Sequence, residues 1–347
     1  MDIDFGGGDE IRFERVGSAG VVTMTRAKAL NAVTHRMVRA LDAALDAWER
    51  DAGVALVVIR SEGRAFSAGG DILDIYKAGL AGHPPVGFFA DEYRLNARIA
   101  RFSKPYVALV DGIVMGGGVG VSFHGSHRVM TENALFAMPE VGIGFFPDVG
   151  GSHILPRLKD GYGMYLALTG SRIRRGDARW AGLATHCVPA AALEPLLAAL
   201  CAGEGPDAAI GRFAEEAAAE TDEATRRSIA GHFSRDSLEA IVTGLAADAD
   251  PFAAATLATL RQRSPTSVRV AFRQIRAGAT LSMDACMRME FRILTRMLAG
   301  SDFYEGIRAA IVEKGTTPVW KPATLEEVAD ADVDAYFAPL EAGDLDL

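Results

Sequence analysis

The sequence predicts an α/β protein, and three observations support this class. Continuous apolar runs at 54–60 ("VALVVIR") and 105–110 ("PYVALV") are typical of strands that are buried on both faces of a sheet. Apolar residues recur at helical spacing in 34–50, and 87–102 also has a helical pattern. Because predicted strands and helices alternate along the chain, we expect a parallel or mixed sheet that is covered by helices.

The second half of the chain has a different character. Beyond about residue 190 the segments are rich in Ala and Leu and helical in pattern, without a convincing strand. The turn-forming stretch "GEGPD" lies at this change. We therefore expect two regions, a core of residues 1–195 that holds the functional site and a helical region of residues 196–347.

The first elements follow from local signals. Residues 11–25 ("IRFERVGSAGVVTMT") read as two short strands around a Gly/Ser turn. Thr34 stands before the apolar spacing of 34–50 and is a favourable helix N-cap. The stretch "GRAFSAGGDI" (63–72) is expected to be a loop that leads into a helix from about Asp71.

Composition excludes several classes of protein. The 347 residues carry 36 basic and 45 acidic side chains, a net charge of −9, whereas a nucleic-acid binder usually has a basic excess. No run of about 18 apolar residues is present, so we expect no membrane-spanning helix. The N-terminus lacks the apolar core of a signal peptide.

The cysteines and histidines give no sign of a metal site. Cys187, Cys201 and Cys286 are widely spaced and form no CxxC motif, which argues against a disulfide framework and a zinc site and favours a cytoplasmic protein. His124 and His127 form an HxxH pair, expected on a helix, but no third ligand lies nearby in the sequence. We predict no metal.

Two glycine-rich loops are the main functional signal. "FSAGGDI" (66–72) and "MGGGVG" (115–120) each follow a predicted buried strand and precede a predicted helix. Glycine allows the backbone to approach a ligand closely. A dinucleotide fingerprint would need Gly at Val121, and no Lys-Ser/Thr follows as in a phosphate-binding P-loop. Tight strand–helix packing is one remaining interpretation, and a two-donor oxyanion hole is the other.

A third stretch carries two acids in apolar surroundings. "AMPEVGIGFFPDVGG" (137–151) contains Glu140 and Asp148 but no Lys or Arg, although an ionised carboxylate is costly to bury without a partner. Apolar surroundings should raise their pKa values, which suits acid–base chemistry near neutral pH. The structural alternative is that Glu140 caps a helix or pairs with a distant arginine such as Arg157 or Arg172.

The three stretches "GRAFSAGGDI", "PYVALVDGIVMGGGVGVS" and "FAMPEVGIGFFPDVGG", in this order and spacing, resemble the crotonase (enoyl-CoA hydratase/isomerase) superfamily. "TRAKALNAV" (25–33) resembles the early coenzyme A-binding segment of that family, with Ala27 where Pro is usual. The resemblance covers residues 10–190 and continues more weakly through 300–328. It implies a spiral of ββα units followed by a helical C-terminal region.

The resemblance also implies a binding site for an acyl-coenzyme A thioester. Two backbone N–H groups, those of Ala68 and Gly117, would polarise the thioester carbonyl. No separate cofactor is expected, because coenzyme A enters as part of the substrate. The residues implied to contact coenzyme A are Arg26, Lys28, Ala29, Ala68, Gly69, Gly70 and Asp71.

The acids point to one branch of the family. Hydratases resemble one another in two glutamates, but the first of these positions is Gly120 here and only the second, Glu140, is present. With Asp148, "FFADEYRLN" (88–96) and "PVWKPATLEEV" (318–328), the chain resembles the 3-hydroxyisobutyryl-CoA hydrolase branch. Glu140 would then act as a nucleophile through a mixed anhydride or as a base toward water.

Asp148 would contact the hydroxyl end of the substrate or orient water and the leaving group. Glu92 matches a substrate-contacting glutamate of the branch.

The expected activity is hydrolysis of a short β-hydroxyacyl-CoA thioester, as in valine degradation. Two alternatives stay open: an enoyl-CoA hydratase or isomerase that uses Glu140 with an unusual partner, and an inactive acyl-CoA-binding scaffold. A serine nucleophile is not expected, since no G-x-S-x-G occurs.

Apart from the acyl-CoA substrate we expect neither nucleic acid nor membrane as a partner. The family resemblance implies a homo-oligomer, either a trimer or a hexamer.

Overall fold

The structure is a computed structural model that describes residues 2–347. The chain forms two compact units, each built from three separate stretches. Unit 1 contains residues 2–71, 91–136 and 173–220, and unit 2 contains residues 72–90, 137–172 and 221–347. This division differs from the expected boundary after residue 195, because a change in local composition does not reveal which distant segments pack together.

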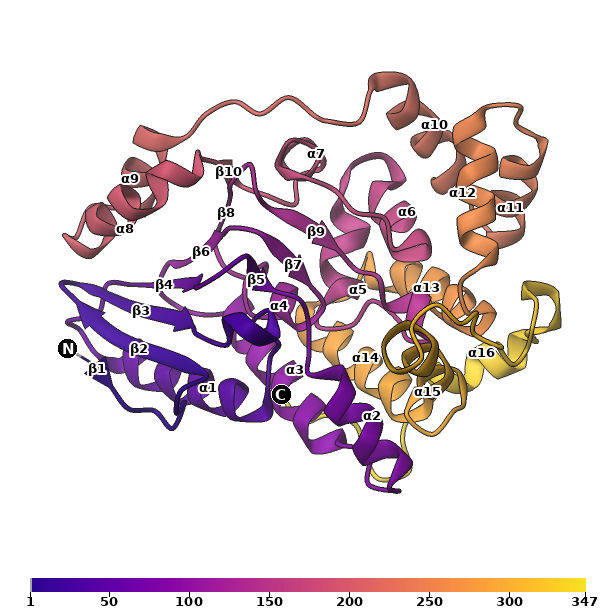
Figure 1. The fold of residues 1–347 in the computed structure, drawn as a ribbon, viewed down its shortest axis with the longest axis horizontal. Coiled ribbons are helices and arrows are strands. Elements are labelled where there is room, and N and C mark those ends of the chain that lie inside the picture. Colours follow the sequence, from indigo (N-terminus) through magenta and orange to yellow (C-terminus); the bar gives the residue numbers. More distant parts are fainter. Residues whose placement is uncertain (1) are drawn as a thin grey trace. The chain divides into compact units, whose positions relative to one another are not determined.

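A seven-stranded sheet is the centre of unit 1 (Figure 1). Its first three strands are antiparallel, and pairing is parallel from β3 to β10. The predicted strands at 11–25, 54–60 and 105–110 are therefore confirmed. In sheet order the strands are β1 (Asp2–Ile3), β2 (Ile11–Val16), β3 (Ala19–Met24), β4 (Leu56–Ser61), β6 (Tyr106–Val110), β8 (His127–Met130) and β10 (His186–Cys187).

A second sheet has three short strands in the order β5 (Ala65–Ser67), β7 (Ile113–Met115) and β9 (Leu135–Ala137). Each follows a strand of the large sheet within a few residues, so the chain alternates between the two sheets: β4 and β5, β6 and β7, β8 and β9. Strand β5 pairs in parallel with β7. The loops that follow these two strands consequently leave the same edge of the small sheet.

Helices cover both faces of the large sheet. On one face, Val21, Val58 and Leu109 form a buried cluster with Leu200 and Ile210 from helices α8 and α9. Gly20, the neighbour of Val21 in β3, faces the other way, because an ideal Cβ on it would lie 2.6 Å from the Trp48 ring of α1. The helices of unit 1 are α1 (His35–Arg50), α4 (Gly117–Gly120), α7 (Arg175–Ala181), α8 (Leu193–Cys201) and α9 (Pro206–Phe213).

Unit 2 is helical, as the second half of the sequence predicts. Helix α3 (Val86–Ala100) begins in unit 2 and belongs to unit 1 from Asp91 onward. Glu140–Ile143 form a 3₁₀ turn, and Arg308–Val312 form a π-helical turn. The α-helices are α2 (Ile72–Leu80), α5 (Gly151–Ile154), α6 (Tyr162–Thr169), α10 (Glu223–Phe233), α11 (Leu238–Ala247), α12 (Pro251–Arg261), α13 (Pro265–Gly278), α14 (Met283–Met297), α15 (Asp302–Ile307) and α16 (Asp330–Phe337).

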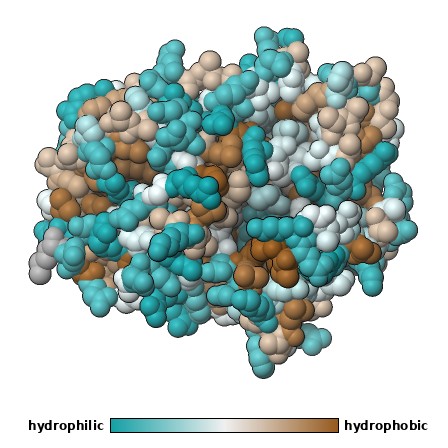
Figure 2. All heavy atoms as spheres, in the orientation of Figure 1, coloured by the Kyte–Doolittle hydropathy of each residue, from teal (hydrophilic) through white to brown (hydrophobic). Residues whose placement is uncertain are grey.

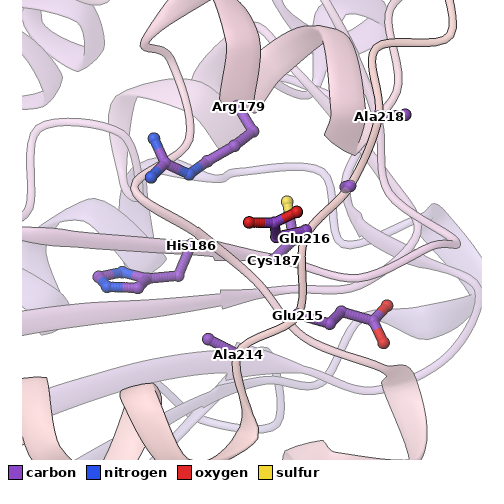
Figure 3. A pocket seen from close by; sticks show the side chains of 8 residues that line it. Arg179, His186, Cys187, Ala214, Glu215, Glu216 and Ala218 are labelled. Carbon is purple, nitrogen blue, oxygen red and sulfur yellow. The ribbon is translucent and has the colours of Figure 1, made fainter.

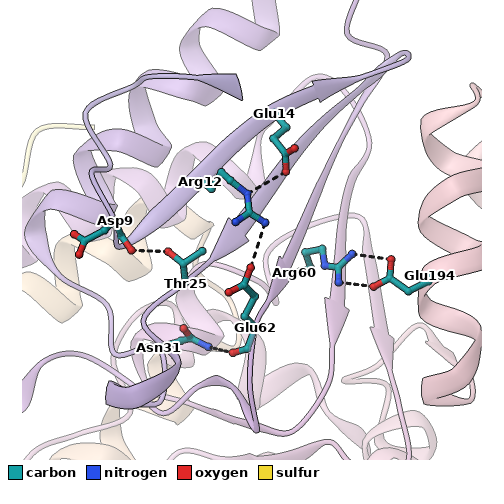
Figure 4. A network of polar contacts seen from close by, with 8 residues as sticks. All are labelled: Asp9, Arg12, Glu14, Thr25, Asn31, Arg60, Glu62 and Glu194. Atoms are coloured by element: carbon teal, nitrogen blue, oxygen red, sulfur yellow. Dashed lines mark hydrogen bonds and ion pairs between the residues drawn. The ribbon is translucent and has the colours of Figure 1, made fainter. Parts of the chain in front are cut away.

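Polar contacts fasten the segment that resembles the coenzyme A-binding segment to the sheets (Figure 4). The buried Asn31 donates through Nδ2 to the carbonyl oxygens of Glu62 and Ala65, each at 2.8 Å. The Glu62 carboxylate in turn pairs with Arg12 at 3.2 Å. Leu30 and Asn31 have φ of 52° and 53°, an uncommon region for non-glycine residues. These contacts hold the turn against the start of β5.

The surface is mixed in character. Figure 2 shows hydrophilic and hydrophobic residues interspersed over the face in view. Among residues 2–347, no helix combines the length and the apolar character needed to cross a membrane.

The close approach of β5 to α4 predicts that Gly118→Ala is destabilising. An ideal Cβ on Gly118 would lie 2.6 Å from the backbone oxygen of Ser67, which cannot move without shifting β5. We expect a loss of about 1–3 kcal/mol, measured from the midpoint of chemical denaturation. Gly211→Ala in α9 is the control, since its Cβ meets nothing within 4 Å and should be neutral or slightly stabilising. Wild-type stability of Gly118→Ala would contradict this packing.

Candidate active site

The two glycine-rich loops meet in unit 1. Both leave the edge at which β5 and β7 end, and their backbones are close together. An ideal Cβ on Gly117 would lie 3.4 Å from the backbone nitrogen of Gly70. The pair of loops therefore presents two stretches of backbone to one small space, as an oxyanion hole requires.

The amide predicted from the first loop needs correction. The N–H of Ala68 donates to the carbonyl oxygen of Leu30 at 3.0 Å, so it is already used. Val33 donates to the oxygen of Gly69 at 2.8 Å and accepts from the N–H of Asp71 at 3.1 Å. The N–H of Gly70 lies between these two bonds and points away from Val33, because successive amides of an extended segment face opposite sides.

Gly70 and Gly117 are therefore the better pair of donors. Among the backbone hydrogen bonds of residues 2–347, neither of their N–H groups is a donor. Gly117 is the first residue of the single-turn α4, where amides have no partner within the helix. The sequence could not reveal which amide is the donor. The choice between Ala68 and Gly70 depends on which of the two N–H groups is already hydrogen-bonded to the neighbouring segment.

Glu92 also belongs to this part of unit 1. It lies on α3, is 2% exposed, and its Oε1 would be 2.9 Å from a Cβ on Gly117. Helix α3 thus brings a carboxylate next to the second glycine loop. The structure therefore brings Glu92 together with Gly70 and Gly117, and its contact with the substrate stays a prediction.

Glu140 and Asp148 lie in unit 2, where both side chains are buried at 6% and 5% exposure. Glu140 opens the 3₁₀ turn, and its Oε2 has no hydrogen-bond partner among the described residues. Burial raises the pKa of Glu140 well above its usual range, and the charge of Asp148 raises it further. A carboxyl group in this state can accept a proton near neutral pH.

The alternative partners for Glu140 do not engage it. The guanidinium of Arg157 donates to the carbonyl oxygens of His153, Gly278 and Leu281 instead. Arg172 is exposed. The charged groups that act on Glu140 are Asp148 and Glu290, which are both acids.

A third buried acid, Glu290, was not predicted as a site residue. It lies on α14, and burial raises its pKa to about 8, with hydrogen bonds from Ser152 and Gly150 opposing the shift and the charge of Asp148 adding to it. The sequence carried a signal for it, because Glu290 interrupts an apolar helix face. Cys286, Met287, Ile293 and Leu294 stand three and four residues on either side of it and are all buried.

The predicted coenzyme A-binding segment lies beside the first glycine loop. The side chain of Arg26 pairs with Asp71 at 3.0 Å and donates to the oxygen of Ala32 at 2.6 Å. Its charge thus helps to hold the segment, and its contact with coenzyme A stays a prediction. Lys28 and Ala29 in the turn Ala27–Ala29 are exposed, and Lys28 is the cation of this turn that faces solvent.

No metal site emerges within residues 2–347, where no group of three or more His, Cys, Asp or Glu side chains is arranged to hold an ion. The expected helix around the HxxH pair is wrong, since His124 lies in a turn and His127 in β8.

A cavity of about 510 Å³ in unit 1 is lined by Arg179, His186, Cys187 and residues 214–218 (Figure 3). None of the predicted site residues lines it.

Known proteins resemble this chain over nearly its full length. The 3-hydroxyisobutyryl-CoA hydrolase of Danio rerio is 43% identical, with 98% of this chain and 92% of that protein covered. The enzyme of the same name from Rattus norvegicus is 42% identical, covering 97% and 90%. A solved structure described as a carnitinyl-CoA dehydratase from Mycobacterium thermoresistibile superposes with a TM-score of 0.92 at 40% identity, covering 97% and 98%.

These relatives correct the expected location. The two hydrolases are mitochondrial by name, which contradicts the prediction of a cytoplasmic protein. Cys187, Cys201 and Cys286 are free and buried. Free thiols are compatible with any reducing compartment, so they could not single out the cytosol.

Membership of a family follows from the comparison and from the fold. The structural superposition confirms the crotonase-like α/β fold with a helical C-terminal region. Residues 19–337 match the family described as enoyl-CoA hydratase/isomerase. This chain belongs to the enoyl-CoA hydratase/isomerase family.

Proposed function

We propose that this protein is an acyl-CoA thioester hydrolase whose substrate is 3-hydroxyisobutyryl-CoA. Identity above 40% over nearly the full length of relatives with that name supports the substrate. The proposed chemistry rests on one observation about Glu140. Its carboxyl group is buried and has a raised pKa, and one of its oxygens has no hydrogen-bond partner among the described residues. Such a group has the capacity to attack a carbonyl or to take a proton from water.

The thioester carbonyl would be polarised by the N–H groups of Gly70 and Gly117. Negative charge grows on its oxygen as the carbonyl carbon is attacked, and fixed donors stabilise that charge. Each such donor is typically worth about 2.7–4 kcal/mol in the transition state. Because both donors belong to the backbone, their position depends on the β5–β7 pairing and on no particular side chain.

Hydrolysis then follows either of two routes through Glu140. In the first, its carboxylate attacks the carbonyl carbon, the C–S bond breaks, and water hydrolyses the resulting mixed anhydride. In the second, it removes a proton from water, which attacks directly. Both routes release the free acid and coenzyme A as a thiol, with one water consumed. The raised pKa makes the carboxylate of Glu140 a stronger base than an ordinary glutamate.

We assign Asp148 and Glu92 to the acyl group and its surroundings. Asp148 would contact the substrate hydroxyl or orient water and the leaving group, and Glu92 would contact the substrate beside Gly117. Coenzyme A enters as part of the substrate, and we propose no further cofactor. A trimer or a hexamer remains our proposal for the assembly, by family resemblance.

Hydration of an enoyl-CoA is the second candidate, favoured by the carnitinyl-CoA dehydratase description of one structural relative. Adding water across a double bond requires a water to be activated and a proton to be delivered to carbon. The position that supplies the other hydratase glutamate is Gly120, whose N–H donates to the oxygen of Gly116 within α4. Hydrolysis needs no acid there and is the better match.

Two substrates distinguish these candidates. We expect 3-hydroxyisobutyryl-CoA to release free thiol, followed with a thiol reagent, and crotonyl-CoA to keep its enoyl absorbance. Loss of that absorbance without thiol release would establish the hydratase instead. Tight binding of both esters without either signal would indicate a scaffold.

Glu140→Gln should abolish hydrolysis and leave a stable fold. The loss of kcat should be about 10²–10⁴-fold or more, since proton transfer or attack requires the carboxylate.

The raised pKa of Glu140 means that the folded state binds its proton more tightly than the unfolded chain. The contribution of Glu140 to stability therefore falls as pH rises above about 4.5, and the melting temperature of Glu140→Gln relative to wild type should increase from pH 5 to pH 8.

The exposed Glu341→Gln serves as the control, with unchanged turnover and a pH-independent difference. Near-normal hydrolysis by Glu140→Gln would remove this residue from the mechanism.

Gly117→Ala tests the two-amide site. The new methyl group would lie 3.4 Å from the Gly70 nitrogen and 2.9 Å from Glu92 Oε1, in the space proposed for the thioester oxygen. We expect kcat/KM to fall by about two to three orders of magnitude, the usual effect of losing an oxyanion donor. The melting temperature should change little, because the nearest contact is the end of a side chain. Unchanged kcat/KM would place the thioester oxygen elsewhere.

A further inference from the structure

Glu290 is a fully buried carboxyl group that the proposed chemistry does not use. Its Oε2 accepts a hydrogen bond from the N–H of Gly150 at 2.9 Å. Its Oε1 accepts from the N–H of Ser152 at 2.9 Å and from the Ser152 hydroxyl. One side chain of α14 thus binds three donors of a single short segment, residues 150–152.

That segment continues directly from Asp148. The oxygen of Asp148 accepts from the N–H of Gly151 at 2.7 Å, which closes a turn between them. Inside the turn, Val149 has φ of 48°. A β-branched residue in the left-handed region is strained and persists only where its surroundings hold it.

The surroundings hold the turn from two helices. Before Asp148, the amide of Gln274 on α13 donates to the oxygen of Pro147 at 2.5 Å. After it, Glu290 on α14 holds Gly150 and Ser152. The backbone on both sides of Asp148 is therefore fixed from the core of unit 2, and the three bonds to Glu290 are the larger part of this support.

This arrangement has an electrostatic cost. A buried carboxyl group is unfavourable unless it is well hydrogen-bonded, and here it lies close enough to Asp148 for the two charges to interact. The carboxylate geometry nevertheless matches the two amides and the hydroxyl together. An apolar residue could fill the same volume, but it could not hold the turn.

We propose that Glu290 is a positioning residue for Asp148, acting through its hydrogen bonds to Gly150 and Ser152. The inference rests on the proposed role of Asp148 in hydrolysis. It assigns Glu290 no contact with the substrate. Its hydrogen bonds influence turnover through the Asp148 side chain, whereas the charge of Glu290 also raises the pKa of Glu140 and would do so with or without Asp148. A residue with a merely structural role, or one that acts on Glu140 alone, would lack the dependence on Asp148.

A double-mutant cycle on the full chain tests this dependence, with hydrolysis of 3-hydroxyisobutyryl-CoA as the readout. Glu290→Gln turns a donor toward one of the amides, and we expect kcat to fall about ten- to a hundredfold while KM stays within about twofold. Asp148→Asn should lower kcat by a similar factor and leave measurable turnover. In the Asp148→Asn background, Glu290→Gln should cost less than about twofold, because the displaced group is already inactive.

The outcomes separate this inference from the proposed function. If Asp148→Asn slows turnover but Glu290→Gln costs the same factor in both backgrounds, Glu290 does not act through Asp148 and the inference is overturned. If Asp148→Asn turns over at the wild-type rate, the role of Asp148 itself fails, and the positioning role fails with it.

Two further variants keep the test decisive. Ser152→Ala removes only the hydroxyl donor and leaves both amides in place, so it covers the case in which Glu290→Gln does not fold. It should lower kcat less than Glu290→Gln and show the same dependence on Asp148. Glu220→Gln is the control in unit 1, where the exposed Glu220 carboxylate also accepts from two backbone N–H groups, those of Gly176 and Asp177 at 3.1 and 2.7 Å. It should leave kcat unchanged.

Discussion

The parallel pairing of β5 with β7 is the constraint on which the proposed site depends. It brings two loops that lie almost fifty residues apart in the sequence to one edge of a small sheet. The approach is so close that a Cβ on Gly117 or Gly118 would contact the neighbouring loop or strand. The donors are backbone amides, so the ability to polarise a carbonyl is a property of the sheet itself. The side chains around it are then available for substrate selection.

The second constraint is the burial of acids in unit 2. Glu140, Asp148 and Glu290 are all buried, and the charge of Asp148 raises the pKa of both glutamates. Such an arrangement lowers stability at neutral pH, because the folded state favours the protonated forms that the unfolded chain does not. Strained or destabilised groups of this kind are typical of functional sites. The apolar surroundings therefore raise the basicity of the two glutamate side chains, in addition to their role in packing.

The hydrogen bonds of unit 1 show how the predicted coenzyme A-binding segment is supported. Asn31 donates hydrogen bonds to carbonyl groups at the start of β5 and so anchors the segment. Arg26 forms an ion pair with Asp71. The segment and the first glycine loop then form a short parallel bridge between Val33 and Gly70. This bridge uses the Gly69 oxygen and the Asp71 N–H and directs the Gly70 N–H away, so the predicted binding segment and the proposed donor are parts of one structure.

The sequence by itself determined the fold class, the family and the strands at 54–60 and 105–110, and it pointed to the acids Glu140 and Asp148, whose roles stay predictions. These depend on local periodicity and on short motifs, which are readable along the chain. Only the tertiary structure decided that the Ala68 N–H is bonded to Leu30, which leaves Gly70 as our proposed donor. It also decided that Arg26 is paired and that Glu290 supports the Asp148 turn.

The division into interleaved units also came from the structure alone. Each of these features depends on which distant group occupies a hydrogen-bonding position, and no local pattern records that.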